Sequence, residues 1–141
     1  MVSSLVLGIF LGDREMNEIW KDLPDYEGIY QVSDMGRVKR CKRTVFRSDG
    51  ITQTLCEMIM ACPHKGTGAQ RYKVFNPINV DDPKGPRNKR RVHREVAKLF
   101  CRGRSPLRDC VNHINGDKLD NRASNLEWLT HQENIKHAVI N

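Results

Sequence analysis

The chain has 141 residues, which is enough for one compact domain or two very small ones. Apolar residues make up 38% and aromatic residues 6%, which excludes a large hydrophobic core and predicts much irregular surface structure. The net charge is +7, and it is concentrated in residues 37–111, which carry nineteen basic and six acidic side chains. A basic surface that serves only solubility is the alternative, but a cationic segment of this length favours a polyanionic partner, above all nucleic acid.

The first residues, 1–15, contain an apolar run from Leu5 to Leu11 that is too short to span a bilayer and has no basic residue before it. We therefore treat residues 1–15 as an uninformative extension, with Met16 as an alternative start, and expect no membrane partner. A weak secretion signal is the other interpretation of this run.

Five cysteines form no tight pair, and an odd number fits a reducing compartment better than a disulfide framework. We expect the protein in the cytoplasm, which is that of the host cell if a phage encodes it. Cys56 and Cys62 lie near His64, but their spacing matches no common zinc pattern, so we do not expect zinc there.

Residues 16–91 are expected to form a β-rich, basic module that contacts DNA. In "IYQVSDMGRVKR", residues 29–40, strand formers on both sides of the turn "DMG" predict two short strands. The second strand would continue into a cationic ribbon that can lie along a DNA groove, formed by Arg37, Lys39, Arg40, Lys42 and Arg43.

The rest of this module is less regular. A hairpin that turns at Asp49-Gly50 and a strand over 71–75 are predicted from the residue pattern. The segment 81–91 is predicted as a loop from its Pro and Gly content. Its cationic end is expected to contact phosphate, although an idle charged loop is the alternative: Arg87, Lys89, Arg90 and Arg91.

Residues 92–141 have a sharper pattern. "VHREVAKLFC", residues 92–101, has the apolar spacing of a helix, with His93 beside that face as a packed structural histidine. "CVNH" and "LEWLT" fit two strands around a loop with a turn at Gly116, and "THQE" is a capping box that opens a last helix. In this segment we expect Leu126 and Trp128 to pack the last helix onto the hairpin, Asn121 to form a turn, and His137 to lie on the surface.

Phosphodiester hydrolysis needs a base for water, a cation on the phosphate and help for the leaving oxygen. His113 suits the first role, because the unperturbed imidazole pKa lies near working pH. A divalent cation can supply the other two, and amide or carboxylate oxygens suit magnesium. Asn112 and Asn134 could meet at one such ion, and Asn125 could hold the loop or orient His113.

The stretch "VHREVAKLF…VNHINGDKLDNRASNLEWLTHQENIKHA" resembles the HNH nuclease domain of phage- and intron-borne homing endonucleases. "IWKDLPDYEGIYQVSDMGRVKR" is similar to the short module that often precedes this domain. The resemblance implies an α+β fold, in which an antiparallel β-rich module is followed by a ββα-metal (HNH) nuclease domain over 92–141.

By the same resemblance, His113 would be the general base and Asn125 the middle asparagine that constrains the base and the loop. Asn112 and Asn134 would be the ligands of one Mg²⁺ or Mn²⁺ ion. Relatives often carry aspartate at the first of these positions and histidine at the second. Two neutral ligands imply weak metal binding that depends on the DNA phosphate.

The function that follows is a metal-dependent DNA endonuclease that nicks or cuts double-stranded DNA, working as a monomer or weak dimer. A DNA-binding protein that keeps the HNH fold only as a scaffold is the alternative. An RNA-binding protein is a third hypothesis, but few aromatic residues for base stacking occur in the basic segment. A His113 that is buried, or one that is separated from Asn112 and Asn134 by more than the span of a metal ion and a water molecule, would contradict the enzymatic interpretation.

Overall fold

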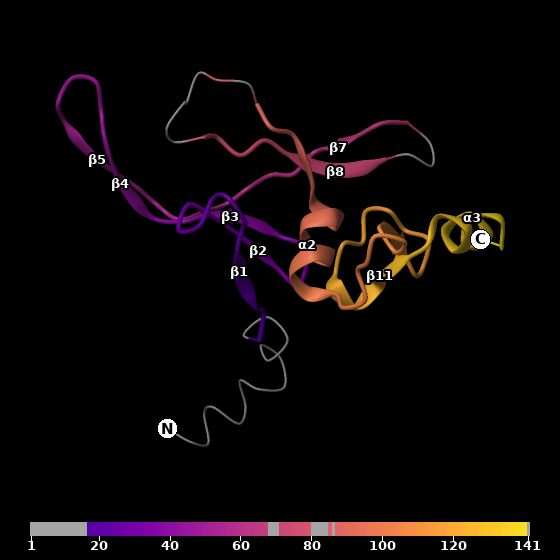
Figure 1. Ribbon diagram of the computed structural model, residues 1–141. Helices are drawn as coiled ribbons and strands as arrows, with labels where there is room; N and C mark the ends of the chain where they lie inside the picture. Colours follow the sequence, from indigo (N-terminus) through magenta and orange to yellow (C-terminus); the bar gives the residue numbers. More distant parts are fainter. Residues whose placement is uncertain (1–16, 68–70, 80–84, 86, 141) are drawn as a thin grey trace, which may run out of the picture.

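The computed structural model describes residues 17–67, 71–79, 85 and 87–140 (Figure 1). The predicted extension over residues 1–15, the alternative start at Met16 and much of the predicted loop over 81–91 lie outside the described residues. Among the described residues, nine short strands precede the first α-helix, two more strands lie between the two α-helices, and every strand pair is antiparallel. The α+β prediction is confirmed.

The first sheet contains the two strands predicted within residues 29–40. Its spatial order is β1 (Trp20–Asp22), β2 (Tyr30–Ser33), β3 (Val38–Arg40) and β6 (Met58–Ile59). In the turn between β2 and β3, the Ser33 hydroxyl accepts the Met35 and Arg37 N–H groups, and Gly36 has a φ of +82°. The second strand ends at Arg40, so the basic cluster is divided between two sheets rather than forming one ribbon.

The predicted hairpin at Asp49-Gly50 is present as β4 (Arg43–Phe46) and β5 (Thr52–Leu55), which extend away from the other elements (Figure 1). Gly50 supplies the positive φ, +81°, that the turn needs. The strand predicted over 71–75 is also found. It lies at the centre of a third sheet as β8 (Tyr72–Phe75), between β7 (His64–Lys65) and β9 (Arg90–Arg91).

Helix α2 (Val92–Phe100) connects the halves of the structure. Its apolar spacing buries Val92, Val96 and Ala97. Figure 1 shows α2 between the β1-β2-β3 sheet and the C-terminal hairpin. The core is therefore continuous across residue 91, and it also includes Leu23, Tyr26, Tyr30, Val32, Val38, Phe75, Leu126 and Trp128.

The C-terminal segment is the predicted hairpin followed by a helix. Strand β10 (Cys110–His113) pairs with β11 (Leu126–Leu129), the short 3₁₀ turn η2 (Ala123–Asn125) precedes β11, and α3 (His131–Ile140) follows. The capping box is confirmed: the Thr130 N–H donates to Glu133 Oε2 at 2.9 Å, and the Glu133 N–H donates to Thr130 Oγ1 at 3.2 Å.

One packing prediction is wrong. Leu126 and Trp128 belong to the core built around α2, and Trp128 Nε1–H donates to the carbonyls of Ala97 and Cys101, each at 3.3 Å. These side chains therefore pack α2, not the last helix, onto the hairpin. His113 is paired with Leu126 across the two strands, so the side chains of His113 and Leu126 point to the same face of the hairpin.

Within the described part of the chain, neither helix has the length and apolar character required to cross a membrane.

Candidate active site

A cavity of about 430 Å³ opens between the hairpin, α3 and β8. It brings three of the predicted site residues together, since His113, Asn112 and Asn134 all line it. The fourth, Asn125, is not among its lining residues. The remaining described lining residues are Tyr72, Val111, Asn115, Gly116, Lys118, His137 and Ala138.

His113 ends β10 and is only 5% exposed, so the burial that was expected to contradict the enzymatic interpretation is present. Its side chain nevertheless lines the cavity together with Asn112 and Asn134. Its Nε2–H donates to Asn121 Oδ1 at 2.9 Å. Because an amide oxygen only accepts, this bond places the imidazole proton on Nε2 and leaves Nδ1 unprotonated. Burial lowers the pKa of His113 below its usual value, which favours the neutral form that a base requires.

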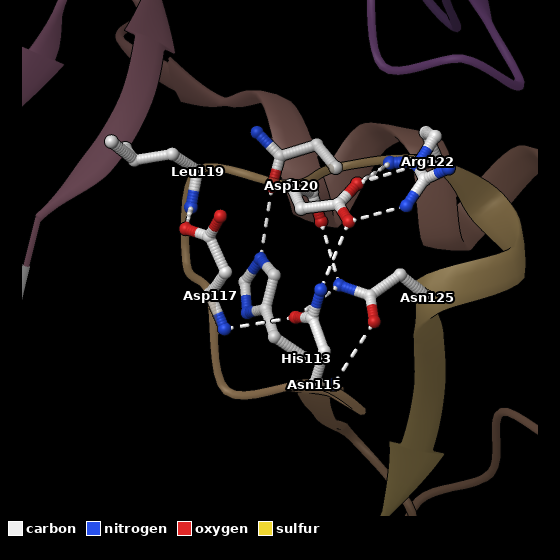
Figure 2. A network of polar contacts seen from close by, with 8 residues as sticks. His113, Asn115, Asp117, Leu119, Asp120, Arg122 and Asn125 are labelled. Carbon is white, nitrogen blue, oxygen red and sulfur yellow. Dashed lines mark hydrogen bonds and ion pairs between the residues drawn. The ribbon is translucent and has the colours of Figure 1, made fainter.

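The loop between β10 and β11 is held by reciprocal amide bonds (Figure 2). The Asn115 N–H donates to Asn125 Oδ1 at 3.0 Å, and Asn125 Nδ2 donates to Asn115 Oδ1 and to the Asp120 carbonyl, both at 2.9 Å. Asn125 thus holds the loop, the first of its two expected roles. The second, orienting His113, is taken by Asn121, which is 3% exposed rather than a simple turn former.

The carboxylates of this loop accept hydrogen bonds from other residues of the same loop. Asp120 accepts two bonds from the Arg122 guanidinium at 2.8 and 2.7 Å, which lowers the pKa of Asp120 to about 2. It also accepts from Asn115 Nδ2 at 3.0 Å (Figure 2). Asp117 accepts the Leu119 N–H at 3.0 Å. Neither aspartate is among the described residues that line the cavity.

The amides Asn112 and Asn134 fit a hard divalent cation by their donor type, although no three His, Cys, Asp or Glu side chains cluster as metal ligands among the described residues. Asn112 Nδ2 donates to Glu127 Oε1 at 2.9 Å, which leaves the amide oxygen outside that bond. If Asn112 bound a cation, the Glu127 carboxylate that holds its amide would offset part of the charge that a neutral ligand leaves uncompensated. Asn134 is held in the first turn of α3, where its N–H donates to the Thr130 carbonyl at 3.0 Å.

Two aromatic neighbours of His113 come from other elements. His93, on α2, is 4% exposed, stacks on Tyr72 with 4.7 Å between ring centroids, and lies 5.1 Å from the His113 ring. Burial, followed by the adjacent His113, lowers the pKa of His93 to about 3. The prediction that His93 is a packed histidine is confirmed. The sequence carried no signal that His93 contacts the site or that Tyr72, on β8, lines the cavity. His137, which was expected on the surface, is half-buried in the cavity wall.

The predicted DNA-contacting cations differ in their surroundings. Arg37 is paired with Glu18 and Lys39 with Glu57, whereas Arg90 is paired with both Asp25 and Glu95 at 3.5 Å. Arg40 and Arg43 are half-buried. The remaining four are exposed, namely Lys42, Arg87, Lys89 and Arg91.

An antiparallel hairpin with a histidine at the end of its first strand, followed by a helix with an asparagine in its first turn, fits the ββα class of nuclease folds. Family models agree with this class: residues 90–136 match the HNH endonuclease family, and residues 18–74 match the NUMOD4 motif. The chain therefore contains a segment that matches the HNH endonuclease family, and a segment that matches the NUMOD4 motif precedes it.

Several known proteins are similar to this chain. An uncharacterised HNH endonuclease of Acanthamoeba polyphaga mimivirus is 38% identical over 128 residues, which cover 89% of this chain and 27% of the relative. The DNA endonuclease I-HmuI of Bacillus phage SP01 is 34% identical over 121 residues, covering 85% of this chain and 57% of the relative. The chain thus spans about a quarter to somewhat over half of these relatives.

A solved structure supports the fold. It describes DNA binding and cleavage by the HNH homing endonuclease I-HmuI, and it superposes with a TM-score of 0.58 at 27% sequence identity. The match covers 86% of this chain and 58% of that chain. The shared architecture therefore extends over most of this chain.

Proposed function

We propose that this protein is a metal-dependent endonuclease that hydrolyses phosphodiester bonds of double-stranded DNA, by nicking or by cutting both strands. The observation that carries the proposal is the single cavity lined by His113, Asn112 and Asn134. The match of residues 90–136 to the HNH endonuclease family and the similarity to a DNA endonuclease support it.

In the proposed reaction, His113 Nδ1 takes a proton from the attacking water while Asn121 holds the other imidazole proton on Nε2. Asn112 and Asn134 would hold one Mg²⁺ or Mn²⁺ ion. When bound, such an ion stabilises the charge that develops on the phosphate and the leaving 3′ oxygen. Because both amides are neutral, we expect metal affinity to be weak without DNA. The products would carry 5′-phosphate and 3′-hydroxyl ends.

The cations of the preceding module are the proposed contacts to the DNA backbone. Lys42, Arg87, Lys89 and Arg91 are the most accessible of them, whereas Arg37, Lys39 and Arg90 would have to share their charge with carboxylates of the protein. Arg40, which donates to the Cys56 carbonyl, and Arg43 are half-buried. We propose that the protein acts as a monomer or weak dimer. Its five free cysteines fit a reducing compartment, such as the cytoplasm of a host cell.

The test combines cleavage of a supercoiled plasmid, with Mg²⁺, Mn²⁺ or EDTA, and a gel shift in EDTA. We expect His113→Ala to lose roughly 10²–10⁴ in cleavage rate, because a positioned base is removed, and to bind DNA as the parent does. His64→Ala, at an exposed histidine on β7, is the control and should cut normally. Cleavage by His113→Ala at the parent rate would show that the base is misassigned.

The competing function is DNA binding without catalysis. The neutral residues at 112 and 134 favour it. A parent protein that shifts DNA but leaves the plasmid uncut with either metal would support this alternative.

A further inference from the structure

Lys118 and Tyr72 form a contact inside the candidate active site. Lys118 Nζ donates to the Tyr72 hydroxyl at 3.3 Å, and the same ammonium lies 5.2 Å from the centroid of the Tyr72 ring. Both residues line the cavity that contains His113 and Asn134. Tyr72 lies in the NUMOD4 segment and Lys118 in the HNH segment, so the two segments build this part of the site together.

The charge inside the cavity is unusual for a metal-dependent site. Among the described lining residues there is no carboxylate, and Lys118 carries the only permanent positive charge. Of the two carboxylates that flank Lys118 in the loop, Asp120 is already paired with Arg122, and Asp117 accepts the Leu119 N–H. None of the ion pairs between described residues includes Lys118.

The Lys118 ammonium therefore has donors left for an anion. It carries three N–H groups, and the Tyr72 hydroxyl accepts one of them. The aromatic face beside it attracts the cation but does not neutralise it. Tyr72 in turn is fixed by its stack on the buried ring of His93, so the position of the ammonium is set by a rigid neighbour.

We propose that Lys118, positioned by Tyr72, binds a phosphate of the DNA backbone inside this cavity. The inference rests on the proposed function, because it takes DNA as the substrate of the site. Lys118 is then a binding residue of the active site and Tyr72 a positioning residue. The contact also gives the anionic substrate an attraction that the two neutral amides do not supply.

The experiment measures DNA binding without cleavage. In the His113→Ala background and in EDTA, a labelled duplex is titrated at several salt concentrations with Lys118→Met, Lys118→Arg, Tyr72→Phe and the control Lys136→Met. Lys136 is exposed on α3 and reports the loss of one positive charge outside the cavity. Thermal unfolding confirms that each variant is folded.

We expect Lys118→Met to weaken binding and to reduce the slope of log affinity against log salt by ~0.9, the value for one phosphate contact on duplex DNA. Lys118→Arg should keep the slope, because the charge remains. Tyr72→Phe keeps the ring and its stack on His93 but removes the hydroxyl, so we expect weaker binding with a nearly unchanged slope. Lys136→Met should leave the slope of the parent.

Equal slopes and affinities for Lys118→Met and Lys136→Met would overturn the inference and assign Lys118 a packing role on Tyr72. The two proposals fail separately. If the parent never cuts DNA but Lys118→Met still loses one phosphate contact, the phosphate site stands and the nuclease proposal falls. If the parent cuts and Lys118→Met binds and cuts as well as the parent, only this inference falls.

Discussion

The hydrogen bond between His113 and Asn121 is the contact that fits the imidazole for base chemistry. Burial lowers the pKa of His113, and the amide oxygen of Asn121 fixes the proton on Nε2. The first effect keeps the ring neutral, and the second decides which nitrogen is free to accept a proton. Only the second effect depends on Asn121, whose sequence position predicted only a turn. By itself, the hydrogen bond to Asn121 raises the pKa of His113 against the larger effect of burial.

A pH profile tests this pairing. Because the pKa of His113 is lowered from 6.5, the neutral base persists as pH falls, and the acid limb of kcat/KM should lie below pH 6.5. In Asn121→Asp, a carboxylate beside the ring favours the imidazolium, so the limb should move to higher pH. Cleavage rates across pH 4.5–8 with a fixed metal ion measure it. An acid limb that stays in place in Asn121→Asp would show that residue 121 does not act on His113.

At the level of elements, the capping box controls where Asn134 lies. Thr130 and Glu133 satisfy each other's backbone N–H groups at the start of α3, and Asn134 is in the turn that they fix. The capping pair thus connects helix stability to the placement of one proposed ligand.

Removing the cap should affect both properties. Thr130→Ala is expected to cost about 0.5–2 kcal/mol of stability, because the Glu133 N–H loses its acceptor. Cleavage should also need more Mg²⁺, since a frayed first turn holds Asn134 less firmly. Urea unfolding and Mg²⁺ titrations of the cleavage rate measure the two effects. Ser48→Ala, in the exposed β4–β5 turn, is the control for removing a hydroxyl, and equal Mg²⁺ requirements in both variants would contradict the link.

At the level of the whole molecule, the module that precedes residue 92 packs against the loop that carries Asn121. The Ala123 N–H donates to the Asp34 carbonyl at 2.7 Å, across the interface between the β2–β3 turn and the loop. A Cβ on Gly36 would lie 2.9 Å from the Asn121 carbonyl carbon. The module therefore supports the backbone of the residue that orients His113.

Gly36→Ala tests this support, with Gly28→Ala as a matched control. Both glycines have positive φ, +82° and +74°, so both variants pay a backbone strain of roughly 1–2 kcal/mol. Only at Gly36 would the new methyl group also meet Asn121, because Gly28 has nothing within 4 Å of that position. Denaturant unfolding should show a larger loss for Gly36→Ala, and single-turnover cleavage should slow in that variant alone. Equal turnover rates in the two variants would refute the connection.

The buried His93 makes the stability of the whole fold depend on pH. Its pKa is about 3 in the folded chain, against the ordinary histidine value of 6.5 expected in the unfolded chain, so the unfolded chain binds the proton more readily between these pH values. The contribution to stability is complete above pH 6.5 and falls as pH drops, by up to about 1.4 kcal/mol per pH unit for this group. Its charged neighbours, Arg91, Arg94 and Lys118, act in the same direction, as does His113.

Replacing the imidazole of His93 with an aromatic ring that does not titrate isolates this effect. His93→Phe keeps an aromatic ring on Tyr72, and its free energy of unfolding should fall less than that of the parent between pH 6.5 and 4.5. Urea unfolding at each pH measures it, and the same change at the exposed His64 is the control. A parent and a His93→Phe variant with parallel pH dependence would show that His93 is not the group responsible.

The sequence by itself determined the local elements of this protein. The turn at Asp49-Gly50, the apolar spacing of α2, the hairpin strands and the capping box of α3 were all predictable, because each depends on residues a few positions apart. Resemblance to a family also indicated which residues meet at the site, and His113, Asn112 and Asn134 do line one cavity.

Only the tertiary structure decided what surrounds that site. Tyr72 meets Lys118 across 46 positions of sequence, Trp128 turns toward α2, and Asn121 rather than Asn125 bonds His113. Local patterns determine which residues share one face of a strand or a helix, but they do not determine which distant element packs against that face. That choice comes from burying one shared core around α2, whose contacts join residues that are far apart in the chain.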